Sequence, residues 1–277
     1  MLNNHIVSIV GLRKEFRRLK RRISSILNAN DINLELGRIA DYKHLTAGYA
    51  HVFDKPFKFH HGPSFVDSYR EIFETEIYQF KPSGTSKIIL DCGANMGLSV
   101  LYFSIHYPDH HIIAFEPDAE IFSILEENVK TFGLKNITLH QKAVWTKTEN
   151  LKFYTDGGMG GRVGNEYAHQ EPKIVEAVPL LDFLTEDVDF LKIDIEGAED
   201  TVLKYCGKSL QNANHIFFEY HNNVNSKQTL HELLALVESL GFYYYVKESE
   251  VRKHPFIDQH LICETFNMAL NVFCYKV

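Results

Sequence analysis

From about residue 87 onward, short apolar runs typical of buried strands alternate with amphipathic segments typical of helices. This alternation predicts an α/β fold, in which helices cover both faces of a mostly parallel sheet. The predicted strands are 87–92, 111–115, 136–140, 190–193, 215–218, 242–246 and 270–275. The predicted helices are 98–106, 118–132, 198–205 and 230–240. Because only a loop separates the last two of the seven strands, we expect the final strand to insert antiparallel.

The first part of the chain, residues 1–80, lacks this alternation and is predicted to be a helical and loop-like appendage to a domain at 81–277. Within it, Leu12, Phe16, Leu19, Ile23 and Ile26 recur at spacings of four and three, which predicts an amphipathic helix over 12–27. The same helix carries the basic residues Arg13, Lys14, Arg17, Arg18, Lys20, Arg21 and Arg22. This helix could lie on an anionic membrane surface, meet an acidic glycan, or dock on its own domain or a dimer partner.

Composition narrows the class of protein. The chain has 277 residues, 45% of them hydrophobic, which is ordinary globular usage, and no apolar run approaches the length of a membrane helix. The net charge of -7 argues against a general nucleic-acid binder. The four cysteines show no paired metal spacing, and the N-terminus lacks the order of a secretory signal. We therefore expect a reducing, cytoplasmic location.

The segment Asp91-Cys-Gly-Ala-Asn-Met-Gly97 follows the first strand of the predicted sheet and opens a helix. Glycines there permit a tight turn and close approach of backbone N–H groups to a ligand. Asp91 stands where the dinucleotide motif has its first glycine, and its carboxylate would repel a pyrophosphate. It could instead pair with a cationic group such as the amino end of S-adenosylmethionine.

A second acidic residue, Glu116, ends the second strand and is placed to accept both hydroxyls of a ribose. Residues 141–144 follow the third strand, where their backbone could meet an adenine edge. Together these features predict a nucleoside-containing cofactor. We assign its site to Asp91, Gly93, Ala94, Asn95, Gly97, Glu116, Pro117, Ala143, Val144 and Asp194.

Three motifs together resemble the FkbM-type methyltransferases: residues 91–97, Phe115-Glu-Pro117, and Leu191-Lys-Ile-Asp-Ile-Glu-Gly-Ala-Glu199. Glu219-Tyr-His221 and Leu270-Asn-Val-Phe273 are also similar to that family. The resemblance covers roughly residues 50–277. It implies the class I methyltransferase (Rossmann-like) fold, S-adenosylmethionine as cofactor, and O-methylation, commonly of sugar hydroxyls in glycans or natural products.

Methyl transfer from a sulfonium chiefly requires alignment of the acceptor with the methyl group. A sugar hydroxyl must also lose a proton, so we expect a general base nearby. We assign His221, after the fifth strand, because imidazole titrates near neutrality, with Glu219 or Asp194 orienting it or the acceptor. Glu196 and Glu199 could take part or could only compensate charge at a helix start.

No residue is assigned as a metal ligand. Asp194, Glu196 and Glu219 offer oxygen atoms through which a magnesium ion could bind two adjacent hydroxyls, but no spacing in the sequence requires a metal.

Two further segments could border the site. The glycine-rich run 156–162 reads as a substrate lid or as a plain surface turn. Tyr69, Glu71, Phe73 and Tyr78 could cover the cofactor or stack on a sugar, or only pack the appendage onto the sheet.

The leading hypothesis is thus an S-adenosylmethionine-dependent O-methyltransferase acting on a sugar or glycan. The alternatives are methylation of a nitrogen or carboxylate on a small metabolite or peptide, a nucleotide-binding oxidoreductase on the same sheet, and a binding module without turnover. Loss of the His221 side chain would separate the first two, because a carboxylate acceptor needs no base.

Overall fold

The structure is a computed structural model that describes residues 32–43, 46–155, 161–163, 171–223, 226–249, 254, 256–257 and 266–277. The chain divides into two compact units, residues 1–66 and 67–277, and each is described by itself. The predicted basic helix 12–27 lies outside the described residues. Within the described ranges, no helix is long and apolar enough to cross a membrane.

The first unit contains a β-hairpin that the sequence pattern did not predict. Residues 32–40 are helical, and β1 (Gly48–Val52) then pairs antiparallel with β2 (Lys55–Phe59). The two residues between these strands, Phe53 and Asp54, both have positive φ, as the tightest hairpin turns require. The expectation of helices and loops alone is therefore corrected here. Helix α2 (Gly62–Tyr69) crosses the boundary between the units.

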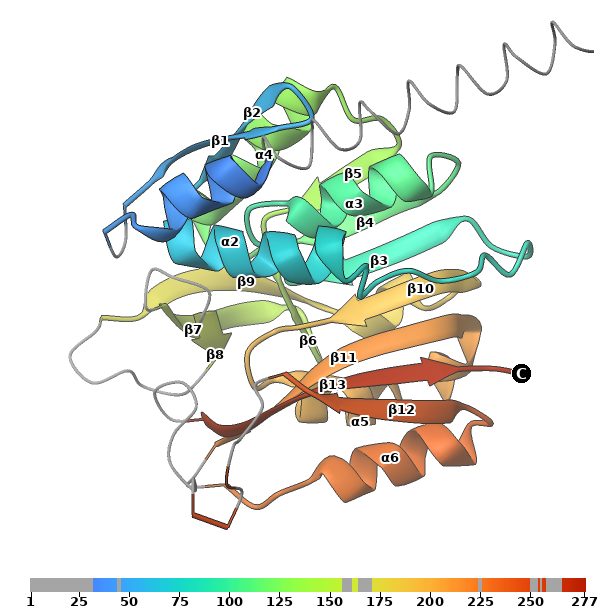
Figure 1. Ribbon diagram of the computed structural model, residues 1–277. Helices are drawn as coiled ribbons and strands as arrows, with labels where there is room; N and C mark the ends of the chain where they lie inside the picture. The colour runs from blue at the N-terminus through green and yellow to red at the C-terminus, as the bar shows by residue number, and fades with distance from the viewer. Residues whose placement is uncertain are drawn as a thin grey trace, which may run out of the picture. The chain divides into compact units, whose positions relative to one another are not determined.

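The second unit is built on a seven-stranded sheet with the order β12-β13-β11-β10-β3-β4-β5 (Figure 1). Its strands are β3 (Ile88–Cys92), β4 (His111–Phe115), β5 (Ile137–His140), β10 (Val188–Ile193), β11 (Ala213–Asn223), β12 (Tyr243–Glu248) and β13 (Phe266–Tyr275). Neighbouring strands are parallel except β13, which is antiparallel to both β11 and β12. This confirms the predicted fold class and the antiparallel insertion of the last strand. The strand order reverses between β3 and β10, which is where open parallel sheets bind ligands.

Helices connect the parallel strands and cover both faces of the sheet. They are α3 (Leu98–His106), α4 (Ala119–Phe132), α5 (Glu199–Cys206) and α6 (Leu230–Ser239). Figure 1 shows α3 in front of the sheet and α5 behind it. Because right-handed crossovers run in opposite directions on either side of β3, helices α3 and α4 fall on one face and α5 and α6 on the other. Shorter helical turns are η1 (Arg70–Glu74), η2 (Leu180–Phe183) and η3 (Gly207–Asn212).

The ends of α4 show why local sequence predicts these elements well. The Asp118 carboxylate accepts hydrogen bonds from the backbone N–H groups of Glu120 and Ile121, at 2.8 and 3.3 Å, and so caps the helix. Gly133 ends it in the left-handed conformation at φ 64°. The helix thus begins within one residue of the predicted range 118–132 and ends where that range does.

A second sheet lies between β5 and β10 in the sequence and was not predicted. It is four-stranded, with the order β6-β9-β7-β8. Its strands are β6 (Ala143–Trp145), β7 (Glu149–Thr155), β8 (Gly161–Val163) and β9 (Lys173–Pro179). The glycine-rich segment read as a lid or turn is partly strand β8, paired with β7, while residues 156–160 lie outside the described residues.

Strand β11 is longer than predicted. The segment Glu219-Tyr220-His221 was expected to close the strand, but the strand continues to Asn223, because each of residues 219–223 pairs with β13. Glu219 and His221 therefore lie within a strand, where residues two apart point to the same face.

Candidate active site

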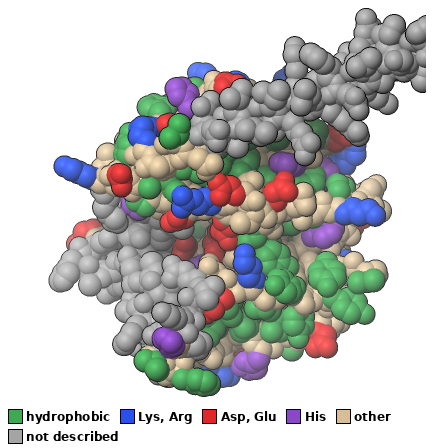
Figure 2. All heavy atoms as spheres, viewed as in Figure 1, with side chains coloured by type: hydrophobic (Ala, Val, Ile, Leu, Met, Phe, Trp, Pro, Cys, Tyr) green, Lys and Arg blue, Asp and Glu red, His purple; other side chains and the backbone are tan. Residues whose placement is uncertain are grey.

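A pocket of the second unit lies at the carboxyl ends of the parallel strands. It encloses about 1130 Å³, part of which is open to solvent. Its walls come from segments far apart in the sequence: Ser68, Glu71, Ile72 and Tyr78, residues 93–96, 115–117 and 142–144, Lys192, residues 194–196 and Glu219. Figure 2 shows acidic side chains gathered near the centre of the visible face, beside hydrophobic surface over β12 and β13.

The glycine turn after β3 forms the floor of this pocket. Gly93 has φ 88°, and a Cβ there would lie 1.9 Å from the carbonyl oxygen of Asp194. Gly97 has φ 94°, and a Cβ there would lie 2.6 Å from Cδ1 of Leu125. No other residue type fits either position without displacing these neighbours. The turn thus brings β3, β10 and α4 together more closely than side chains would allow.

The backbone N–H groups of this turn are already used within the protein. Those of Gly93 and Ala94 donate to the carbonyl of Phe115, and that of Asn95 donates to the Glu116 carboxylate. Gly97 closes the turn by donating to Ala94. Residues 93–95 line the pocket, so the close approach of their backbone to a ligand stays a prediction, although these three N–H groups already have partners within the protein. The arrangement is unlike a phosphate cradle, which needs such N–H groups unpaired.

Asp91 lies below the pocket floor rather than in its lining. Its carboxylate is fully buried, accepts a hydrogen bond from Ser99 Oγ at 2.5 Å, and lies 3.3 Å from Lys192 Nζ. Lys192 also donates to the Gly93 carbonyl at 2.8 Å and lies 3.5 Å from Asp194. The cation beside Asp91 is thus a lysine of the protein itself.

Lys192 was missed by sequence reasoning, although a lysine inside the apolar strand β10 was a visible signal. Burial alone would lower the pKa of Lys192, but the carboxylates of Asp91 and Asp194 raise it well above its usual range. The ammonium stays charged and ties β3 to β10 at the point where the pocket opens.

Glu116 lies in the pocket wall at the end of β4, as predicted. One carboxylate oxygen accepts the Asn95 N–H at 3.0 Å and the other accepts the Asp118 N–H at 2.9 Å. Burial raises the pKa of Glu116 to about 7. The side chain is therefore held in one orientation, and each oxygen keeps a further lone pair for a ligand hydroxyl.

The other predicted binding residues fall in the same pocket. Ala94 and Asn95 line it beside Gly93, and Pro117 follows Glu116. Ala143 and Val144 line it from β6, where they pair with β9. Gly97 is absent from the lining but shapes the turn. Of the aromatic residues noted before the first sheet strand, Tyr78 lines the pocket, and its ring centroid lies 5.0 Å from that of Phe217 on β11. Tyr78 therefore both borders the pocket and packs on the sheet.

Opposite Glu116, the ends of β10 and β11 bring together Asp194, Glu196, Glu199, Glu219 and His221, hereafter the carboxylate–His221 cluster. His221 Nδ1 lies 3.3 Å from Glu199, while Nε2 lies 3.7 Å from Glu196 and 3.9 Å from Glu219. Glu199 is buried and also accepts the backbone N–H groups of Ile195 and Gly197. Glu199 therefore anchors the loop and the imidazole. It also lies in the first turn of α5, where the sequence suggested charge compensation at a helix start.

The charges in this cluster shift one another. Burial raises the pKa of Glu196 to about 8, against the opposing effect of His221. Burial and the nearby Asp194 raise the pKa of Glu219 to about 7. Burial alone would lower the pKa of His221, but Glu196, Glu199 and Glu219 raise it well above its usual value.

These shifts alter the assignment of a base. A protonated imidazole has no lone pair with which to accept a proton, and His221 does not line the pocket. Asp194, Glu196 and Glu219 do line it. The carboxylates, rather than the imidazole, are placed to meet an acceptor.

Near this cluster, Glu71 extends from η1 into the pocket wall and accepts a hydrogen bond from Asn271 at 3.1 Å. Burial and the charge of Asp194 raise the pKa of Glu71. Glu71 was noted from the sequence as a residue that could border the site, whereas Asn271 was noted only within the family-like segment 270–273, without a role. Asn271 lies opposite Glu219 in the β11–β13 pair, which no local pattern could have revealed.

The segment that forms this site is similar to a known protein family. The sequence profile of the FkbM methyltransferase domain matches residues 91–244, which contain the glycine turn, Glu116 and the carboxylate–His221 cluster. The chain belongs to this family. The seven-stranded sheet with its antiparallel final strand is the class I methyltransferase fold that membership implies.

Two fungal relatives are similar over part of their length. Methyltransferase 1 of Beauveria bassiana (strain ARSEF 2860) is 27% identical, over 49% of this chain and 65% of the relative. Methyltransferase sdnD of Sordaria araneosa is 28% identical, over 49% of this chain and 66% of the relative. The match thus spans slightly less than two thirds of these curated relatives.

Among solved structures, the methyltransferase FkbM of Methylobacillus flagellatus KT is similar with a TM-score of 0.45 and 16% identity. The similarity covers 73% of this chain and 46% of that one.

Proposed function

We propose that this protein transfers the methyl group of S-adenosylmethionine to a hydroxyl group of a sugar or glycan. The observation that carries the proposal is Glu116, held in the pocket wall by two backbone N–H groups at the end of β4. A carboxylate fixed there can accept both hydroxyls of a ribose. Membership of the FkbM methyltransferase family supports the same reaction class.

In this proposal the ribose meets Glu116 and the adenine lies against residues 142–144. The charged amino-acid end then points toward Asp194 and the carboxylate–His221 cluster. The negative charge of that cluster favours both the ammonium and the sulfonium of the cofactor. Asp91, which pairs with Lys192, is left out of the contact set.

The proposed chemistry is a single in-line displacement. A lone pair of the acceptor oxygen forms the new bond to the methyl carbon, and the carbon–sulfur bond breaks to leave neutral S-adenosylhomocysteine. The hydroxyl proton passes to one of the carboxylates that line the pocket. We assign Glu196, because burial raises its pKa to about 8 and so makes its ionised form the stronger base. His221 acts as a positioning residue through its contacts with Glu199 and Glu196.

The acceptor is tested by methyl transfer from labelled S-adenosylmethionine to two panels, one of glycans and sugar nucleotides and one of carboxylate-bearing peptides and metabolites. We expect transfer to the sugar panel alone. With such an acceptor, Glu196→Gln should lower turnover by about 100- to 10,000-fold, the usual contribution of a general base. The matched control Glu186→Gln changes an exposed glutamate and should have no effect.

Transfer confined to the second panel, with Glu196→Gln nearly as active as the wild type, would replace the sugar hydroxyl by a carboxylate acceptor. The cytoplasmic location and the role of the basic helix 12–27 stay predictions.

A further inference from the structure

We propose that Asp194, Glu219 and His221 form a binding site for one divalent metal ion at the acceptor end of the pocket. The three residues each offer one ligand atom, and these atoms lie within 4.8 Å of one another. The site stands on this geometry alone, whereas the role given to it below rests on the proposed function.

The sheet itself brings the three side chains together. Strands β10 and β11 are parallel neighbours, and Ile193 pairs with Phe218, so Asp194 follows directly beside Glu219. His221 lies two residues further along β11 and shares a face with Glu219. The ligands thus come from rigid strand ends, which is how precise sites are held.

The imidazole of His221 is the observation that separates this site from an ordinary group of acidic residues. Its side chain is only 7% exposed, and its Nδ1 contacts the Glu199 carboxylate at 3.3 Å. A carboxylate on one ring nitrogen is the arrangement that orients a metal-ligating histidine and leaves its other nitrogen for the ion. A divalent ion that binds there displaces the proton that the surrounding carboxylates otherwise hold on Nε2. Glu199 is in turn fixed by the N–H groups of Ile195 and Gly197, so this supporting layer is complete.

Among the described residues, the second ring nitrogen, Nε2, makes no hydrogen bond. Its distances to Glu196 and Glu219, 3.7 and 3.9 Å, are too long for one. Two atoms that share a metal at about 2.1 Å each are separated by roughly 3 to 4 Å. The spacing therefore suits a shared cation between Nε2 and a carboxylate oxygen better than direct contact.

The ligand chemistry indicates the class of metal. Two carboxylates with one imidazole suit a divalent transition-metal cation such as manganese better than calcium, which prefers oxygen atoms alone. Three protein ligands leave coordination positions for water or for an acceptor. An acceptor with two adjacent hydroxyls fills two of them, and the metal lowers the pKa of the bound hydroxyl. Glu219 is then a ligand, and Glu196 is left to take the proton.

The test is a titration of the full chain with Mn²⁺, with free ion followed by electron paramagnetic resonance, with and without S-adenosylhomocysteine. We expect one Mn²⁺ per chain. His221→Gln and Glu219→Gln should each weaken Mn²⁺ binding at least about 100-fold, and Glu199→Gln about 10- to 100-fold as a supporting residue. The control His231→Ala removes an exposed histidine on α6 and should leave binding unchanged.

S-adenosylhomocysteine binding is measured on every variant and shows that each is folded. It is also a measurement of cofactor binding that does not depend on the metal. Absence of Mn²⁺ binding by a wild-type protein that binds S-adenosylhomocysteine would overturn the metal site and leave the proposed function intact. Equal Mn²⁺ affinity of wild type, His221→Gln and Glu219→Gln would also overturn it. Mn²⁺ binding that depends on His221, without S-adenosylhomocysteine binding, would support the site and contradict the proposed function.

Discussion

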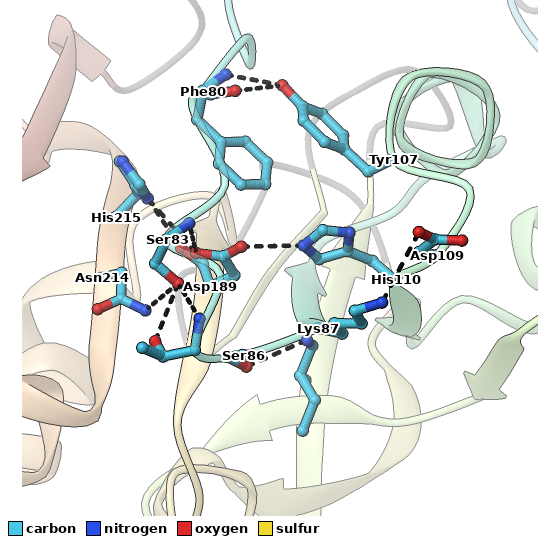
Figure 3. A network of polar contacts seen from close by, with 12 residues as sticks. Phe80, Ser83, Ser86, Lys87, Tyr107, Asp109, His110, Asp189, Asn214 and His215 are labelled. Carbon is cyan, nitrogen blue, oxygen red and sulfur yellow. Dashed lines mark hydrogen bonds and ion pairs between the residues drawn. The ribbon is translucent and has the colours of Figure 1, made fainter.

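The two ends of the central sheet both contain buried carboxylates beside histidines, and they differ in how those groups are satisfied. At the amino end, Asp189 lies at the start of β10 (Figure 3). One of its carboxylate oxygens accepts the Ser83 N–H at 3.1 Å, and the other lies 2.9 Å from His110 Nε2. At the carboxyl end, several carboxylates share the single imidazole of His221.

The surroundings of Asp189 and of His221 also differ. Around Asp189, the rings of Phe80 and Tyr107 pack on His110, and His215 Nδ1 donates to the Asp189 carbonyl at 3.0 Å (Figure 3). Around His221, the carboxylates of Glu196 and Glu219 line a pocket. The comparison teaches that a buried acid–histidine contact is by itself no sign of chemistry. Excess charge of one sign beside a hollow is the informative feature.

The largest contrast is expected in turnover. Glu196→Gln, at the carboxyl end, should lower methyl transfer by about 100- to 10,000-fold, because it removes the proposed general base from the acceptor site. Asp189→Asn, at the amino end, should leave turnover close to that of the wild type. Steady-state rates with the identified acceptor measure both. Comparable losses in the two variants would mean that the two ends are not functionally distinct.

Stability should show the opposite pattern. Asp189→Ala leaves His110 and the Ser83 N–H without their partner in a buried place, and should cost about 3–5 kcal/mol in the free energy of unfolding. Urea unfolding measures this cost, with affinity for S-adenosylhomocysteine unchanged in the folded fraction. A loss below about 1 kcal/mol would show that the amino-end network is not a structural clamp.

The pH dependence of stability tests the electrostatics of the pocket wall. The pKa of Glu116 is raised to about 7 in the folded protein, above its ordinary value of 4.5, so the folded state binds more protons than the unfolded state between these values. Stability is then full below about pH 4.5 and falls as pH rises through 7, by at most about 3 kcal/mol from this group. Glu116→Gln should flatten that part of the profile. An unchanged slope would mean that Glu116 ionises as freely as in the unfolded chain.

The smallest effect is expected at an exposed group of charges that resembles neither end of the sheet. Lys204 on α5 contacts Asp200 at 2.7 Å and Glu232 at 2.5 Å, with all three side chains about one third exposed. Lys204→Ala should change the free energy of unfolding by less than about 1 kcal/mol, because water screens such pairs. A larger loss that persists at high salt would mean that exposed ion pairs contribute to the stability of this protein as much as buried groups do.

Much of the fold could be predicted from local sequence, because each signal acts within a few residues. The cap at Asp118, the stop at Gly133 and the apolar run of β4 needed no distant partner. The small sheet β6–β9 was missed because its strands are short and partly exposed, so that their stability depends on pairing with one another. The extension of β11 was missed for a related reason, since its polar residues are strand only because β13 lies beside them.

The site residues likewise divide into those that local sequence predicts and those that depend on contacts between distant segments. Glu116 and the glycine turn could be predicted, because each directly follows a strand that the local sequence predicts. The pairing of Asp91 with Lys192 depends on β3 and β10 being neighbours, about a hundred residues apart in the chain, and no spacing encodes it. The charged state of His221 likewise depends on three carboxylates that the fold assembles around it.

The measurement that tests the central claim most directly is calorimetric titration of the wild-type protein and Glu116→Ala with S-adenosylhomocysteine, with NAD as control ligand. The account predicts wild-type binding on the order of micromolar or tighter, no binding of NAD, and a loss of about 2–3 kcal/mol in Glu116→Ala from the missing ribose contacts. Binding of NAD in place of S-adenosylhomocysteine, or equal affinity of the two proteins for S-adenosylhomocysteine, would contradict it.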